Sequence, residues 1–350
     1  MNSKSFSQVL LAAFLFGAAT PFSKTLLENL HPNQLAGLLY IGAALFLLPS
    51  VCMRYKSGGV LFPRSSRNRK NLIGAIVLGG VIGPVLLLVG LRFALASSVS
   101  MWLNLEATAT AILSVIFFRE HLGKWTWIGS VGVVVAGLIL GFDSDWSGWI
   151  GLICVSGAAI AWGLDNNFTA VIDEIRPEDS TFLKGLVAGS INCIIGFSLF
   201  EWNISTEWLY ALTLGGLAYG ISIVLYIHAA QNMGATRSQI VFASSPFFGV
   251  ILSVIFIKET FGFPQLAAAV VMAGSIALLF KDQHEHRHEH LPVSHEHAHS
   301  HDEHHQHSHE EETPSEHSHP HIHRAMLHSH PHCPDIHHRH EHLKTTSTGT

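Results

Sequence analysis

The sequence predicts an all-helical integral membrane protein whose ten spans form two five-helix halves that cross the bilayer in opposite directions. Three observations support this fold class. Hydrophobic residues make up 48% of the 350-residue chain and charged residues only 13%, whereas soluble domains carry about 25% charged residues. Ten apolar segments of membrane-spanning length follow one another. The second five of these segments repeat sequence patterns of the first five.

The ten segments can each cross a membrane, because a helix needs about 20 apolar residues to span the hydrocarbon core. The first is expected to be a span and not a cleaved signal peptide, since many similar runs follow it. The connections are short, which favours antiparallel neighbours. The expected spans are 7–27, 34–53, 71–91, 97–118, 124–142, 148–170, 180–200, 208–229, 236–257 and 262–280.

The longest connection, 54–70, predicts the orientation of the chain. It contains six basic residues, and an excess of Lys and Arg marks the cytoplasmic side of a membrane. The connections 143–148 and 201–207 contain neither Lys nor Arg and are expected outside. With ten spans, both termini are then cytoplasmic.

Internal repeats divide the chain into two halves. The block LSVIFFREHLG begins at Leu113, and LSVIFIKETFG begins at Leu252, 139 residues later. The block at 16–32 likewise resembles that at 162–177. Because five is odd, two such halves enter the membrane in opposite directions, an arrangement typical of secondary transporters with a substrate site near the midplane. The predicted domains are 1–142, 143–281 and a C-terminal tail, 282–350.

These blocks give the chain a resemblance to the drug/metabolite transporter superfamily, EamA type. The resemblance rests on the two SVIF-x-[RK]-E-x-x-G blocks and the Gly-rich fifth spans, and it covers about residues 7–280. Stretches such as FGAATPFSK (16–24) and LNLEATATA (103–111) are similar to a bacterial subgroup. The resemblance implies a ten-helix inner-membrane permease of small molecules, and it implies no particular substrate.

Glu106 is the first candidate functional residue, because it lies near the middle of the fourth span. A charge at mid-bilayer costs about 2.5–3.5 kcal/mol, so such residues usually face a partner or a water-filled cavity. No cation is expected at its depth, and burial then favours the protonated carboxyl. We therefore expect a proton carrier. The alternative is a carboxyl that only hydrogen-bonds the nearby Asn104 or a backbone carbonyl.

Asp165 and Lys184 are expected at similar depth on consecutive spans, with Asn166 and Asn167 beside the carboxylate. An ion pair between them would remove two isolated charges from the membrane. This pair either takes part in gating or only holds the two helices together.

Three further residues complete the predicted substrate or coupling site. Lys24, in the outer third of the first span, reaches Glu106 only if that span packs against the fourth. Pro21 is expected to interrupt the first span and free a carbonyl, and such breaks often flank a substrate site. Tyr219 lies beside a Gly-rich stretch and could line the transport path.

The tail differs from the rest of the chain, since 23 of the 26 histidines lie between His284 and His342. Such a polar sequence cannot bury a core, so disorder is expected. Imidazole suits zinc, nickel and cobalt, and the spacing HxH brings two rings near one ion. The densest stretch supplies the candidate metal ligands His328, His330, His332, Cys333, His337, His338, His340 and His342.

Together these features predict a secondary transporter of a small organic metabolite or drug, coupled to an ion or a proton or working as an exchanger. The alternative is a zinc, nickel or cobalt transporter, or a metal- or pH-sensing membrane protein; against it, the spans contain few metal ligands. The sequence predicts no enzyme, no required cofactor and no nucleic-acid partner. The expected partners are the small-molecule substrate and the bilayer, and the sequence also allows a divalent metal and a homodimer.

Overall fold

Helices form in each of the apolar segments that the sequence identifies. The computed structural model describes residues 3–56, 61–118, 123–142, 146–172, 174–202, 204–233, 238, 241–279 and, in the tail, 285–290, 293–299, 317–323 and 326–331. The first half contains α1 (Ser3–Leu26), α2 (Pro32–Lys56), α3 (Ser66–Ala75), η1 (Ile76–Ile82), α4 (Gly83–Phe93), α5 (Ala96–Trp102), α6 (Leu105–Phe118) and α7 (Lys124–Phe142). The second half contains α8 (Trp146–Thr169), α9 (Pro177–Leu199), α10 (Thr206–Gly215), η2 (Gly216–Ile221), α11 (Ser222–Met233), α13 (Ser245–Leu252), η3 (Ser253–Ile257) and α14 (Phe263–Leu279).

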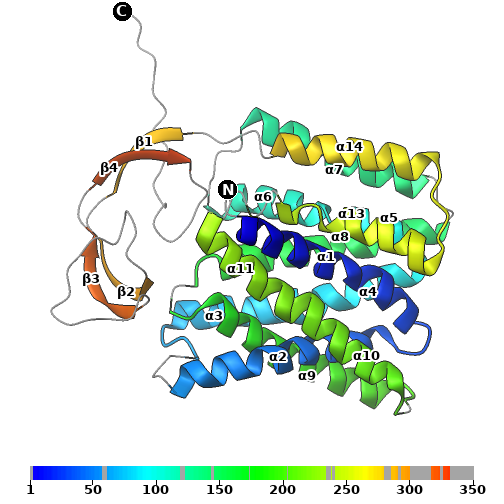
Figure 1. Ribbon diagram of the computed structural model, residues 1–350, viewed down its shortest axis with the longest axis horizontal. Helices are drawn as coiled ribbons and strands as arrows, with labels where there is room; N and C mark the ends of the chain where they lie inside the picture. The colour runs from blue at the N-terminus through cyan, green and yellow to red at the C-terminus, as the bar shows by residue number, and fades with distance from the viewer. Residues whose placement is uncertain are drawn as a thin grey trace, which may run out of the picture.

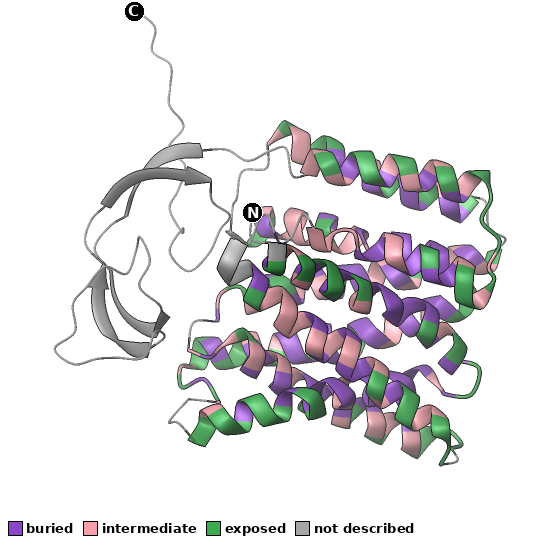
Figure 2. Cartoon of the chain, in the orientation of Figure 1, coloured by how far each residue is buried: buried purple, intermediate pink, exposed green. Residues whose placement is uncertain are grey.

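The described helices supply ten apolar elements. Eight are long and apolar enough to cross a membrane, and two shorter apolar helices, Ser245–Ile257 and Phe263–Leu279, follow them. Buried positions lie between the helices, and exposed positions lie on their outer sides (Figure 2). Large apolar side chains occupy many of these exposed positions, as a lipid-facing surface requires; examples are Leu45, Ile116, Phe142, Ile153, Ile194 and Leu199. The prediction of an all-helical membrane fold is confirmed.

The helix contacts follow a two-fold pattern, which can be traced in Figure 1. The second elements of the two halves pack along each other as α2 and α9, and the last elements do so as α7 and α14. Two further pairings are matched between the halves. Helix α8 packs on α4 and α6, and its counterpart α1 packs on α11 and α13. Exchanging the two halves therefore reproduces these helix pairings.

Two glycines at matched positions allow these close contacts. A Cβ atom on Gly17 of α1 would overlap the Ser245 carbonyl oxygen of α13, and a Cβ atom on Gly163 of α8 would lie 3.0 Å from the Thr110 amide nitrogen of α6. Small residues let helix backbones approach each other in this way. The repeated glycine thus explains why the same helix crossing forms in both halves.

Wide helical turns interrupt the third element of each half. The π-helix η1 joins α3 to α4, and the π-helix η2 joins α10 to α11; both include part of the repeated sequence LGG. Single π-helical turns within α-helices are frequent at functional sites. Pro84 and Pro246 stand in the first turn of α4 and α13. The expected interruption at Pro21 does not occur, because α1 continues through it to Leu26.

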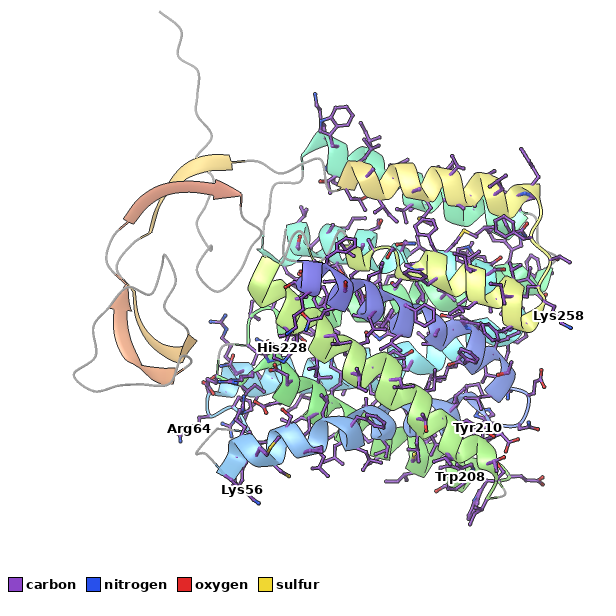
Figure 3. The ribbon with its side chains drawn as sticks, viewed as in Figure 1. Lys56, Arg64, Trp208, Tyr210, His228 and Lys258 are labelled. Atoms are coloured by element: carbon purple, nitrogen blue, oxygen red, sulfur yellow. The ribbon has the colours of Figure 1, made fainter. Side chains whose placement is uncertain are left out.

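The two ends of the bundle carry different side chains. Figure 3 shows Lys56, Arg64 and His228 at one end of the helices and Trp208, Tyr210 and Lys258 at the other. Helix α1 begins and α14 ends at the first of these ends (Figure 1). The helical bundle therefore begins and ends on the same side, as an even number of crossings requires.

The tail contains four short strands, β1 (Glu285–His290), β2 (Val293–His299), β3 (His317–His323) and β4 (Met326–Pro331). They form two antiparallel pairs, β1 with β4 and β2 with β3. A two-stranded ribbon alone is marginally stable in water. Disorder over the tail as a whole therefore stays a prediction.

Candidate functional site

Asp165 of α8 and Lys184 of α9 lie together inside the bundle. The Lys184 Nζ lies 2.7 Å from Asp165 Oδ1 and 2.6 Å from Oδ2. Thr169, one helical turn after Asp165, donates a hydrogen bond of 3.1 Å to Oδ1. The sequence brings the two charges to the same depth because α8 and α9 are consecutive and antiparallel. The expected contact between them is therefore present.

Glu106 and Asn166 connect the two halves of the chain. The Asn166 Nδ2 of α8 donates a hydrogen bond of 2.9 Å to Glu106 Oε1 in the first turn of α6. The same amide donates to the Thr110 Oγ1, one turn further along α6, at 3.1 Å. Glu106 also lies within electrostatic range of Asp165 and Lys184. The carboxyl group therefore belongs to the same polar cluster as the ion pair.

Two other asparagines of the predicted site bind backbone carbonyls. The Asn167 Nδ2 donates to the Gly163 carbonyl at 2.7 Å and to the Thr110 carbonyl at 3.3 Å. Asn104 lies in the turn between α5 and α6, and its amide donates to the Met101 carbonyl at 3.3 Å. Both side chains are buried. Their amide donors satisfy backbone acceptors, and Glu106 is bound by Asn166 and not by Asn104.

The wide turn η1 exposes a carbonyl to the site. Tyr40 Oη donates to the Gly79 carbonyl at 2.8 Å, and Trp162 Nε1 donates to the same oxygen at 2.9 Å. A Cβ atom on Gly79 would overlap the carboxylate of Asp165. The π-helix therefore places its backbone directly against the ion pair, and two aromatic side chains hold it there.

A group of aromatic rings lies next to the polar cluster. The ring centroids of Tyr40 and Tyr219 are 6.0 Å apart, and those of Tyr219 and Phe16 are 5.7 Å apart. Phe16 also contacts Phe242, which precedes α13, at 5.3 Å. These rings come from α1, α2, η2 and the segment before α13. Tyr219, a predicted site residue, lies at the centre of this aromatic group.

Lys24 lies apart from this cluster. Its Nζ donates to the Leu91 carbonyl at 2.5 Å and to the Ala94 carbonyl at 3.0 Å, at the C-terminal end of α4. A cation at a helix C-terminus satisfies carbonyls that have no partner within the helix. The structure thus gives Lys24 a capping contact and does not bring it to Glu106.

Comparison with known proteins agrees with this arrangement. The model of the EamA-like transporter family matches residues 4–142 and 149–281. The chain belongs to the EamA-like transporter family.

Two relatives of this EamA-like protein carry names that state a transport role. A protein of Methanothermobacter thermautotrophicus, named as an uncharacterized transporter, is 27% identical over 292 residues, which are 78% of this chain and 84% of the relative. The uncharacterized transporter YoaV of Bacillus subtilis is 22% identical over 258 residues, 69% of this chain and 86% of the relative. A crystal structure 16% identical in sequence covers 78% of this chain and 95% of its own, with a TM-score of 0.58. That structure shares the fold.

Sequence reasoning missed several residues of the EamA-like protein's site. Tyr40, Thr110 and Trp162 belong to the cluster, yet each reads as an ordinary apolar or small polar residue of a span. A glycine within a span usually indicates only close helix packing, yet the Gly79 carbonyl is the acceptor that joins Tyr40 and Trp162. The repeat offers a signal for Trp162 alone, because this residue aligns with Phe16 of the other half.

The tail residues predicted as metal ligands are only partly described. His328 and His330 lie in β4, opposite His288 and His286 of β1. The other six, His332, Cys333, His337, His338, His340 and His342, lie outside the described residues. Over the part of the chain that the structure describes, no group of three or more His, Cys, Asp or Glu side chains is arranged to hold a metal ion.

Proposed function

We propose that this EamA-like protein is a secondary transporter that moves a small organic solute across the inner membrane by alternating access. The observation that carries the proposal is the link between Glu106 of the first half and Asn166 of the second. A carboxyl group within a span is costly and usually functional. Here it also lies at the boundary along which two inverted halves would rock.

The proposed coupling ion is a proton carried by Glu106. Deprotonation would leave a charge whose hydrogen-bond donor is the Asn166 amide, while the nearby Lys184 is bound to Asp165, and protonation would remove that charge. The two states therefore differ in how strongly α6 is held to Asn166 on α8, because hydrogen bonds to ionised groups are stronger than neutral ones. A change in this contact is a way for the proton to bias the relative position of the two halves.

The proposed role of Asp165 and Lys184 is to set the shape and charge of the site from the second half. Both residues belong to α8 and α9, and the Asp165 carboxylate lies against Gly79 of η1 in the first half. Through this contact, a change in the ion pair would shift the backbone of η1. The competing explanation is a fixed ion pair that only holds α8 and α9 together. The basic connection 54–70 supports a cytoplasmic position for the end of the bundle that carries Lys56 and Arg64.

The first test is solute flux through the purified full-length protein in liposomes with an imposed pH gradient. Candidate solutes come from an uptake and resistance screen on a deletion strain. We expect flux to depend on the gradient and to be lost in Glu106→Gln. Glu201→Gln is the matched control, because Glu201 is an exposed acid in the connection between α9 and α10. Gradient-driven flux at the wild-type rate in Glu106→Gln would refute the proton-carrier role.

The proposed role of the tail is to bind divalent zinc, nickel or cobalt and thereby regulate transport. Its support is the histidine composition, together with strands that place His286 opposite His330 and His288 opposite His328. The rival hypothesis of metal transport through the spans has no such support from the polar cluster, which contains one ion pair, one further carboxyl group and amides.

A further inference from the structure

The charges of the site do not balance. Lys184 binds both carboxylate oxygens of Asp165 at 2.6–2.7 Å, so its positive charge is matched there. Over the described residues, the ion pairs leave Glu106 without a cation of its own. An ionised Glu106 therefore gives the cluster one uncompensated negative charge. Charges inside a membrane are normally paired, so a bound group with a single positive charge would complete this site.

The aromatic group lies near this charge. Tyr40 donates a hydrogen bond to the Gly79 carbonyl, and Gly79 lies against the Asp165 carboxylate. Tyr40 and Tyr219 also lie within electrostatic range of Glu106. Phe16 and Phe242 extend the ring surface beyond them at centroid distances of 5.7 and 5.3 Å. All four side chains are only partly buried, and so is Glu106. Aromatic faces attract a cation within about 6 Å of the ring centroid, and this attraction is strongest where water is excluded.

Other kinds of solute fit this combination less well. An anion would meet two carboxylates, and the one ammonium group in the cluster is already bound to Asp165. A zwitterion would encounter the same obstacle at its carboxylate. A metal ion prefers several oxygen, nitrogen or sulfur ligands, whereas the rings offer π-faces. A neutral solute would leave the charge of Glu106 unpaired.

We infer that the site takes a small organic cation, an amine or quaternary ammonium with an aromatic or apolar body, whose charge pairs with Glu106 against the ring of Tyr219. The inference rests on the proposed function for its transport step and adds the substrate class. When the cation binds to the protonated site, the proton leaves the Glu106 carboxyl group for water. When a proton returns, the cation is released. The charge at the site is the same before and after the exchange.

The test measures binding to the purified full-length protein in detergent, without transport. The probe is benzyltrimethylammonium, which cannot lose a proton. Its controls are 2,2-dimethyl-1-phenylpropane, a neutral compound of the same shape, and benzoate and phenylalanine. We expect the cation to bind at least tenfold more tightly than each control. We also expect about one proton to be released per cation bound in weakly buffered solution below the pH at which Glu106 ionises.

Variants assign the binding to these residues. Glu106→Gln should abolish proton release and weaken cation binding at least tenfold. Tyr219→Leu should weaken binding several-fold, whereas Tyr219→Phe should retain it because the ring remains. Tyr210→Leu is the matched control, since Tyr210 is exposed at the far end of the bundle (Figure 3). Each variant is first checked for an unchanged elution volume and helical content.

The outcomes separate this inference from the proposed transport. Equal binding of the neutral compound, tighter binding of benzoate or phenylalanine, or full cation binding by Glu106→Gln would overturn the cation assignment. Flux of a neutral or anionic solute without cation binding would overturn it too, and would leave the transporter in place. Cation binding with proton release but without flux of any tested solute would support the cation site and count against the transport function.

Discussion

Lys184 and Asp165 form an ion pair through both carboxylate oxygens, although their side chains are only 17% and 7% exposed. Each charge alone would be costly within a span. Together they are supported by the Thr169 hydroxyl and by the nearby backbone of Gly79. The pair links consecutive helices of the second half to a wide turn of the first half, so its loss should affect both stability and the shape of the site.

Removing one partner of this pair should destabilise the protein more than removing both. Breaking a buried pair leaves an uncompensated charge and costs about 3–5 kcal/mol, whereas replacing both partners is often nearly neutral. We expect Lys184→Met and Asp165→Asn each to lower the thermal unfolding temperature in detergent, and the double variant to recover most of the loss. A double variant as unstable as the sum of the single ones would contradict the pairing.

The same variants separate a structural from a gating role. If the pair only holds α8 to α9, the stable double variant should transport at close to the wild-type rate. A folded double variant without flux would assign the pair a part in gating. The measurement is solute flux in liposomes, normalised to the amount of protein inserted.

Gly79→Ala should disturb the site through the backbone. The added Cβ atom would overlap the Asp165 carboxylate, which is a short side chain with little room to move away. Overpacking of this kind costs about 1–3 kcal/mol. Gly274→Ala in α14 is the matched control, because its Cβ atom would meet no atom within 4 Å. Equal unfolding temperatures for the two variants would show that the wide turn has space to relax.

Glu259 provides another test, because it caps a helix of the opposite half. Its carboxylate oxygens accept hydrogen bonds from the Ala96 amide at 2.6 Å and the Ser97 amide at 2.9 Å, at the start of α5. Loss of such a cap costs about 0.5–2 kcal/mol. We expect Glu259→Ala to lower the unfolding temperature and Glu259→Gln, which keeps one acceptor oxygen, to lower it less. Identical values for both variants would argue against the cap. The repeat partner, Glu120, lies outside the described residues.

The sequence was sufficient to predict the helices and the strongest electrostatic contact. Spans follow from the length of apolar runs, and the pairing of Asp165 with Lys184 follows from equal depth on neighbouring helices. Both depend only on where residues fall along the chain, and this can be read directly from the sequence. Contacts between residues far apart in sequence, such as Glu106 with Asn166, depend on which helices pack together, and the repeat alone did not settle that.

Contacts to backbone atoms were the least predictable. Lys24 binds carbonyls at the end of α4, and Tyr40 binds the Gly79 carbonyl within a π-helix. A backbone acceptor is present at every residue, so the sequence does not mark which one becomes free. Local helix geometry decides this, and neither the wide turns nor the continuation of α1 through Pro21 has a signature in the sequence.

The pH dependence of stability should depend in part on Glu174, in the connection between α8 and α9. Burial acts to raise its pKa, but hydrogen bonds from the backbone amides of Ser65 and Arg64 outweigh this effect and hold the pKa below its ordinary value of 4.5. A lowered folded-state pKa contributes stability above the unfolded pKa and loses it as the pH falls through the folded value. We expect wild type to unfold at a higher temperature than Glu174→Gln at pH 7, and the difference to shrink below pH 4.5. A constant difference would contradict this assignment.

Truncation before His284 tests whether the tail or the helical bundle binds zinc. The truncated protein loses 23 of the 26 histidines, and imidazole is the main zinc ligand available in the tail. We expect calorimetry to detect zinc binding by the full chain at pH 7.5 and almost none by the truncated protein. Binding should weaken sharply by pH 5.5, because a protonated imidazole cannot bind a metal. If the tail regulates transport, zinc should change the flux of the full chain and leave that of the truncated protein unaltered. An equal response of both proteins to zinc would place the metal site within the helical bundle and remove the proposed role of the tail.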